Sequence, residues 1–89
     1  MKINLFKNNL SLGDTYGVQT GDYVGELWTF IRSEGDDYEF LSMPKNVNRK
    51  IPKNKFDFGL KENIIEFVEK VPKTVRRVIK AQFEENQKG

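Results

Sequence analysis

Three Gly-Asp steps divide the first half of the chain into short strand-like segments, and they constrain the fold more than any other feature. They occur at Gly13-Asp14, Gly21-Asp22 and Gly35-Asp36, each between stretches rich in aromatic and β-branched residues. Glycine takes a positive φ without steric cost, so it suits the first central position of a type II′ hairpin turn. The pattern predicts an antiparallel meander of three to four strands over residues 1–43, with the first strand at 2–7.

The flanks of Gly35-Asp36 specify a register. With these two residues as the loop, Arg32 faces Glu39, and the pairing continues to Trp28 opposite Met43. Charge then meets opposite charge and apolar meets apolar, and such cross-strand pairs stabilise a sheet. The side chains that this register places on the core face are Trp28, Phe30, Leu41 and Met43.

The same reasoning applied to Gly21-Asp22 places Tyr16 opposite Leu27. Gly17 and Gly25 then fall inside strands, where glycine often marks a bulge, a bend or a close backbone approach. Glycines at these positions could allow a strongly curved sheet, as in a small partial barrel.

A ligand-binding role for the Gly-Asp steps is the alternative, and the spacing argues against it. A loop starting at Asp14 lacks the acids that an EF-hand needs at its third and fifth positions. Neither a phosphate-binding Gly-Lys-Ser/Thr nor a dinucleotide-binding Gly-x-Gly follows. We expect no metal and no cofactor.

Four aromatic residues of the predicted hairpin have two interpretations. On an open sheet they could stack the bases of single-stranded nucleic acid. Their hairpin is acidic, however, and would repel phosphates, so we favour a place in the core. These residues are Trp28, Phe30, Tyr38 and Phe40.

A basic connector is predicted at residues 44–56. Pro44 and Pro52 exclude it from the interior of a regular element. It carries five bases and no acid: Lys45, Arg49, Lys50, Lys53 and Lys55. Such a segment can follow phosphates or bind an acidic partner, or it can simply be a soluble crossover from sheet to helix.

Two helices are predicted over residues 57–86. The first spans about 60–70, because apolar side chains recur there at helical spacing, with Gly59 or Asp57 as its cap. Pro72 suits the first turn of a second helix, which extends to about Asn86. The tail at 87–89 is expected to fray.

A basic stripe on the second predicted helix is the most specific functional signal. Its members recur at i, i+3, i+4 and i+7 and lie nearly opposite the apolar side chains. They are Lys73, Arg76, Arg77 and Lys80. The stripe could bind nucleic-acid phosphates or an acidic protein, or it could be an ordinary solvated face that pairs with neighbouring glutamates.

Composition limits the chemistry. The 89 residues include no histidine and no cysteine, which excludes the usual zinc sites and nucleophile–base pairs. Residues 1–43 hold three bases and seven acids, 44–56 hold five bases, and 57–89 hold seven bases and six acids. This asymmetry can mark a binding surface, or the two halves can partly neutralise each other across the fold or simply be solvated. No apolar run is long enough to span a bilayer.

We therefore predict a single α+β domain over 1–89, with the meander followed by two packed helices, cytoplasmic and of bacterial or phage composition. We expect a non-enzymatic binding or regulatory protein that acts stoichiometrically on a macromolecular partner. The expected surface is the basic connector together with the basic stripe. A protein partner is favoured over DNA or RNA, which is the alternative; no membrane is expected, and a homo-oligomer is compatible.

Overall fold

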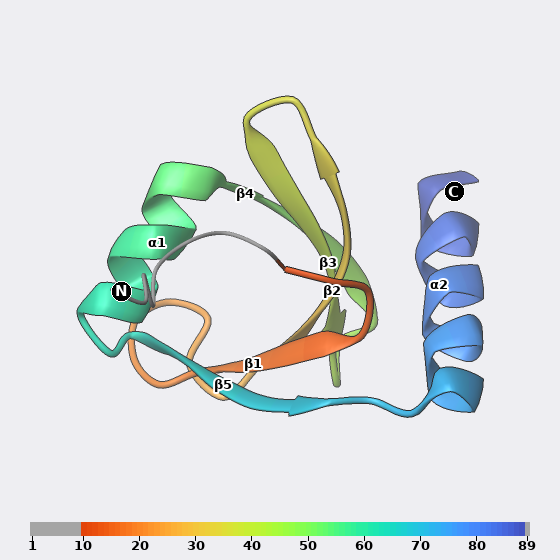
Figure 1. Ribbon diagram of the computed structural model, residues 1–89, viewed down its shortest axis with the longest axis horizontal. Coiled ribbons are helices and arrows are strands. Elements are labelled where there is room, and N and C mark those ends of the chain that lie inside the picture. The colour runs from red at the N-terminus through yellow and green to blue at the C-terminus, as the bar shows by residue number, and fades with distance from the viewer. Residues whose placement is uncertain (1–9, 89) are drawn as a thin grey trace, which may run out of the picture.

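The chain folds as a five-stranded antiparallel sheet with two helices (Figure 1). The computed structural model describes residues 10–88. In chain order the elements are β1 Asp14–Val18, β2 Leu27–Glu34, β3 Asp37–Met43, β4 Val47–Pro52, α1 Lys53–Lys61, β5 Ile65–Lys70 and α2 Lys73–Lys88. The α+β class is as predicted, but residues 10–88 form five strands rather than three or four, and one helix lies in mid-chain. The expected strand at 2–7 lies outside the described residues.

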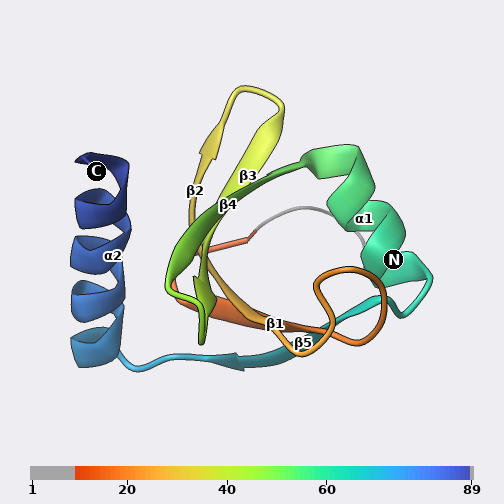
Figure 2. The same cartoon turned by 180° about the vertical axis from the view of Figure 1, so that it is seen from behind.

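The strand order is β4-β3-β2-β1-β5, and all neighbours are antiparallel. The sheet curls, and α1 lies in the opening between its edge strands β4 and β5 (Figures 1 and 2). Helix α2 packs against the other face, over β2, β3 and β4. The two helices are therefore on opposite sides of the sheet. In the described part of the chain, neither helix is long and apolar enough to cross a membrane.

The Gly35 hairpin confirms the predicted turn and only part of the predicted register. Gly35 has φ +59°, as a type II′ turn requires, and Arg32 pairs with Glu39. A bulge at Ile31 then shifts the ladder by one residue, so Trp28 pairs with Ser42 and not with Met43. A bulge adds one residue to one strand, and side chains beyond it change face relative to a regular ladder.

The turn expected at Gly21-Asp22 is part of a longer loop between β1 and β2. Gly21 has φ +95° and its carbonyl accepts a hydrogen bond from Val24 N at 3.2 Å. Tyr16 pairs with Trp28, one residue away from the predicted partner. Gly25, with φ +91°, closes the loop by donating to Val18 O at 2.9 Å and does not lie inside a strand.

The helix predicted at 60–70 is wrong. Residues 53–61 form α1, and Ile65–Lys70 form β5 on the free edge of β1. Gly59 and Asp57 lie inside α1 and cap no helix there. The predicted connector is also corrected, since most of it is strand β4 and the start of α1. The second helix is confirmed, with bounds Lys73–Lys88.

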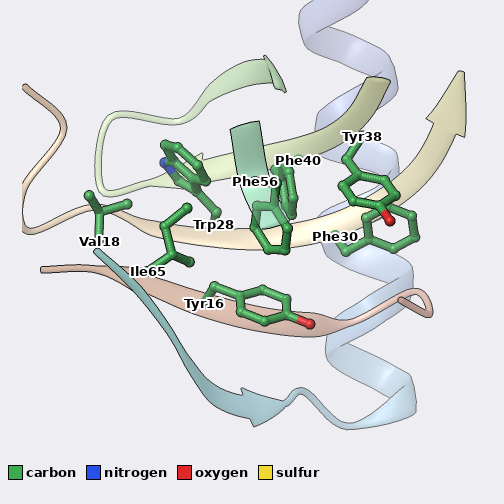
Figure 3. Packing of buried hydrophobic residues seen from close by; sticks show 8 residues of the cluster. All are labelled: Tyr16, Val18, Trp28, Phe30, Tyr38, Phe40, Phe56 and Ile65. Atoms are coloured by element: carbon green, nitrogen blue, oxygen red, sulfur yellow. The ribbon is translucent and has the colours of Figure 1, made fainter. Parts of the chain in front are cut away.

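The main core lies on the inner face of the curled sheet (Figure 3). Phe56 of α1 enters it and contacts Tyr16 edge-on at 4.9 Å and Phe40 in a stacked pair at 5.1 Å between ring centroids. Trp28, Phe30, Tyr38 and Phe40 are all buried, as the core interpretation requires. Such aromatic pairs contribute beyond the area that they bury.

A smaller core joins α2 to the outer face of the sheet. Phe83 packs there against Ile31 and Leu41, with Ile79 and Leu12 at its margin. Leu41 is therefore on the face opposite Trp28, and Met43 is exposed, so two of the four residues predicted for one core face are misplaced. The bulge at Ile31 accounts for this difference.

Candidate functional site

The nine predicted partner-binding bases lie in two groups on different elements of the fold. Lys45, Arg49, Lys50, Lys53 and Lys55 lie on or beside β4 and α1. Lys73, Arg76, Arg77 and Lys80 lie on α2, across the sheet from α1 (Figures 1 and 2). Each group therefore has to be judged by its own surroundings.

A buried carboxylate neutralises part of the connector group. Glu26, whose side chain is 5% exposed, accepts hydrogen bonds from Arg49 Nη2 at 2.9 Å, Trp28 Nε1 at 2.9 Å and Ser42 Oγ at 2.7 Å. Lys45 Nζ approaches it to 3.6 Å. Burial raises the pKa of Glu26, but these donors outweigh burial and lower it to about 2. Arg49 is therefore committed to the structure of the protein.

The other connector bases differ in how far they are compensated. Lys50 Nζ lies 3.6 Å from Glu39, which also accepts a 2.8 Å hydrogen bond from Arg32. Lys53 lies over the ring of Tyr38, 5.5 Å from its centroid. Lys55 is exposed and forms no ion pair with another described residue.

An open groove of about 410 Å³ lies between the β1–β2 loop, the end of β4 and α1. Its walls are mainly apolar and aromatic, with two lysines at the margin. The lining residues are Tyr23, Trp28, Lys50, Ile51, Pro52, Lys55, Phe58, Gly59, Ile64 and Ile65. Phe58 is 58% exposed and Tyr23 39% exposed, so both rings are accessible to a ligand. We call this feature the aromatic groove.

The β1–β2 loop, which forms one wall of the aromatic groove, is held in place by contacts to its residue Tyr23. The Arg49 guanidinium lies 4.1 Å from the centroid of the Tyr23 ring, a cation–π contact. Tyr23 also contacts Trp28 edge-on at 5.8 Å. Because Arg49 is itself fixed by Glu26, the position of Tyr23 depends on a buried network and not on the loop alone.

The bases of α2 are in a different state. Lys73, Arg77 and Lys80 are exposed, and none forms an ion pair with another residue in the range 10–88. Arg76 is partly buried and donates from Nε to Val71 O at 3.1 Å. The predicted charge therefore remains available on α2, whereas much of it is compensated on the connector.

Sequence reasoning missed the aromatic groove and the role of Glu26. Tyr23, Phe58 and Ile64 come from three separate segments, and the groove between them exists only after α1 forms where a connector was predicted. The sequence offered no signal for the groove, because α1 was not predicted at Lys53–Lys61.

Within residues 10–88, no group of three or more acidic, histidine or cysteine side chains could hold a metal ion. The aromatic groove offers apolar contact area and aromatic faces, which suit recognition of a ligand. Comparison with protein-family models, with curated proteins and with solved structures finds no match to this chain.

Proposed function

We propose that this is a non-enzymatic binding protein that holds a short apolar segment of a protein partner in the aromatic groove. The observation that carries the proposal is the open groove of about 410 Å³ with Tyr23 and Phe58 exposed on its walls. Exposed aromatic residues beside a concave apolar surface are the usual anchors of protein recognition.

The charge around the aromatic groove favours a protein segment over nucleic acid at this place. Arg49 is neutralised by Glu26 and Lys50 is paired with Glu39, so Lys55 is the one uncompensated base among its lining residues. A nucleic-acid strand needs several bases along its phosphates. A peptide with one acidic residue near apolar side chains needs only one such base.

The rigidity of the groove wall supports the same proposal. Tyr23 is fixed on Arg49, and Trp28 donates its indole N–H to Glu26, so neither ring has to be ordered when a ligand binds. Binding costs less free energy when the contact side chains are already held in place.

The test selects ligands from a display library of random linear peptides and measures their affinity by the fluorescence of Trp28, the single tryptophan of the chain. We expect selected peptides to change this fluorescence and to lose about tenfold or more in affinity on Phe58→Ala. Phe67→Ala is the matched control, because Phe67 is 52% exposed but lies outside the groove. Failure to select any binder, or equal losses in the two variants, would refute the proposal.

A further inference from the structure

The outward bases of α2 form no ion pair in the described part of the chain, and the same is true of Lys53, Lys55 and Lys61 on α1. Lys73, Arg77 and Lys80 have no carboxylate partner there, whereas Lys45, Arg49, Lys50, Arg32 and Lys70 all do. The first turn of α2 contains no acid, and none occurs between Lys70 and Lys80. The charges of Lys73, Arg77 and Lys80 are therefore not used in ion pairs within residues 10–88.

Arg76 extends the row with a side chain that is held in place. Its Nε donates to Val71 O at 3.1 Å, and its stem packs on Gly13. A Cβ at position 13 would lie 2.5 Å from Arg76 Cδ, so the glycine makes room for this stem. No described carboxylate forms an ion pair with the guanidinium. A guanidinium held in this way suits phosphate oxygens, which it can bind through two N–H groups.

The four bases share one flank of α2. Their spacing of i, i+3, i+4 and i+7 from Lys73 to Lys80 places them on neighbouring turns over about 10 Å of helix. The exposed apolar residues of the helix, Val75 and Val78, line a different groove together with Met43. The basic flank therefore offers charge without an apolar anchor.

This composition distinguishes between the two classes of acidic macromolecule. Protein interfaces depend on buried aromatic and apolar anchors and are depleted of lysine. The nucleic-acid backbone is bound by charge alone, through lysine and arginine on phosphates. We infer that the flank formed by Lys73, Arg76, Arg77 and Lys80 binds the phosphate backbone of nucleic acid, without sequence preference.

This surface is separate from the aromatic groove, because α1 and α2 lie on opposite sides of the sheet (Figures 1 and 2). One molecule can therefore hold a peptide segment and a nucleic acid at the same time. The two proposals stand independently, since no residue of the basic flank lines the groove.

The experiment measures fluorescence anisotropy of labelled mixed-sequence DNA, double-stranded in one arm and single-stranded in the other. For wild type we expect binding at about 50 mM salt, with log K falling against log salt at a slope of about −3 to −4 on the duplex. The triple variant Lys73→Gln, Arg77→Gln and Lys80→Gln should reduce affinity at least about tenfold and bring the slope closer to zero by about 3. All three side chains are exposed, so the variant should unfold at the same urea concentration as wild type.

The control variant removes the same charge elsewhere, through Lys45→Gln, Lys53→Gln and Lys61→Gln, and should keep the wild-type slope. Equal losses in the two triple variants would show that net charge alone drives binding, and would overturn the inference. Absence of binding by wild type at about 50 mM salt would also overturn it. Competition by poly-glutamate as strong as that by unlabelled DNA of equal charge would overturn the inference as well, because the flank would then be a site for an acidic protein.

Discussion

Replacing Glu26 by glutamine tests the network beneath the aromatic groove most directly. The carboxylate accepts hydrogen bonds from Arg49, Trp28 and Ser42 and lies 3.6 Å from Lys45 Nζ. Glutamine keeps the shape of the side chain but removes its charge. The amide nitrogen of glutamine is also a hydrogen-bond donor, and it would face the donors that now bind the carboxylate.

The size of the effect follows from the pKa of Glu26. The native environment lowers this pKa from an ordinary value of 4.5 to about 2. Each pKa unit corresponds to about 1.4 kcal/mol, so the ionised carboxylate contributes about 3 kcal/mol to the free energy of unfolding at neutral pH. A small domain has roughly 5–15 kcal/mol in total, so this one side chain accounts for a large share.

The sign of the pH dependence is fixed by the direction of the shift. The folded pKa is below the unfolded pKa, so the contribution is complete above about pH 4.5 and is lost as the pH falls towards about 2. We therefore expect the difference in unfolding free energy between wild type and Glu26→Gln to be about 3 kcal/mol at neutral pH and to shrink steadily below about pH 4.5.

Urea titrations followed by far-ultraviolet circular dichroism, repeated between about pH 7 and pH 2, measure this difference. Glu66→Gln is the control, because Glu66 is exposed and forms no ion pair with a described residue, so its effect should be small at every pH. A difference for Glu26→Gln that stays constant down to about pH 2 would contradict the reasoning. The substitution would then act through packing and not through charge.

Two further substitutions, each with a control, test the packing of the two helices. Gly59→Ala should lower the unfolding free energy by about 1–3 kcal/mol, because a Cβ there would lie 2.6 Å from Ile65 Cδ1. The control Gly17→Ala, whose nearest contacts would be at 3.4 Å, should change the unfolding free energy by less than about 1 kcal/mol, and equal losses in urea titrations would contradict this account. Phe83→Ala should cost about 3–5 kcal/mol and raise amide hydrogen exchange throughout α2, since Phe83 is 1% exposed in the contact with the sheet. Val78→Ala, at a position 67% exposed, should cost at most about 0.5 kcal/mol, and comparable losses for the two positions would place the buried face of α2 elsewhere.

Local signals predicted the elements whose cause is local. Helix α2 was expected from the apolar spacing after Pro72, and it forms at Lys73–Lys88. The Gly35 turn was expected because glycine alone takes the required φ at no cost, and it forms with Arg32 opposite Glu39. In both cases the residues that determine the conformation are within a few positions of each other.

The error at residues 60–70 has a non-local cause. The apolar residues there fit a helical period, and Ile65 and Phe67 also fit the period of a strand, so the pattern alone was ambiguous. The segment forms β5 because the free edge of β1 needs backbone partners, which Ile65–Lys70 supply. The bulge at Ile31 could not be predicted either, because counting pairs outward from the turn assumes a regular ladder. This bulge determines which side chains reach each core.

The amino-acid sequence by itself determined the fold class, the absence of histidine and cysteine chemistry, and the identity of the basic and aromatic side chains. Only the tertiary structure decided which of them are available to a partner. Arg49 and Glu26 are 23 positions apart, and their pairing compensates the charge of one predicted base. Lys73, Arg77 and Lys80 form no such pair with a described residue. Charge availability depends on distances through space, because an ion pair forms wherever folding brings opposite charges together, and those distances are set by the curvature and strand order of the sheet.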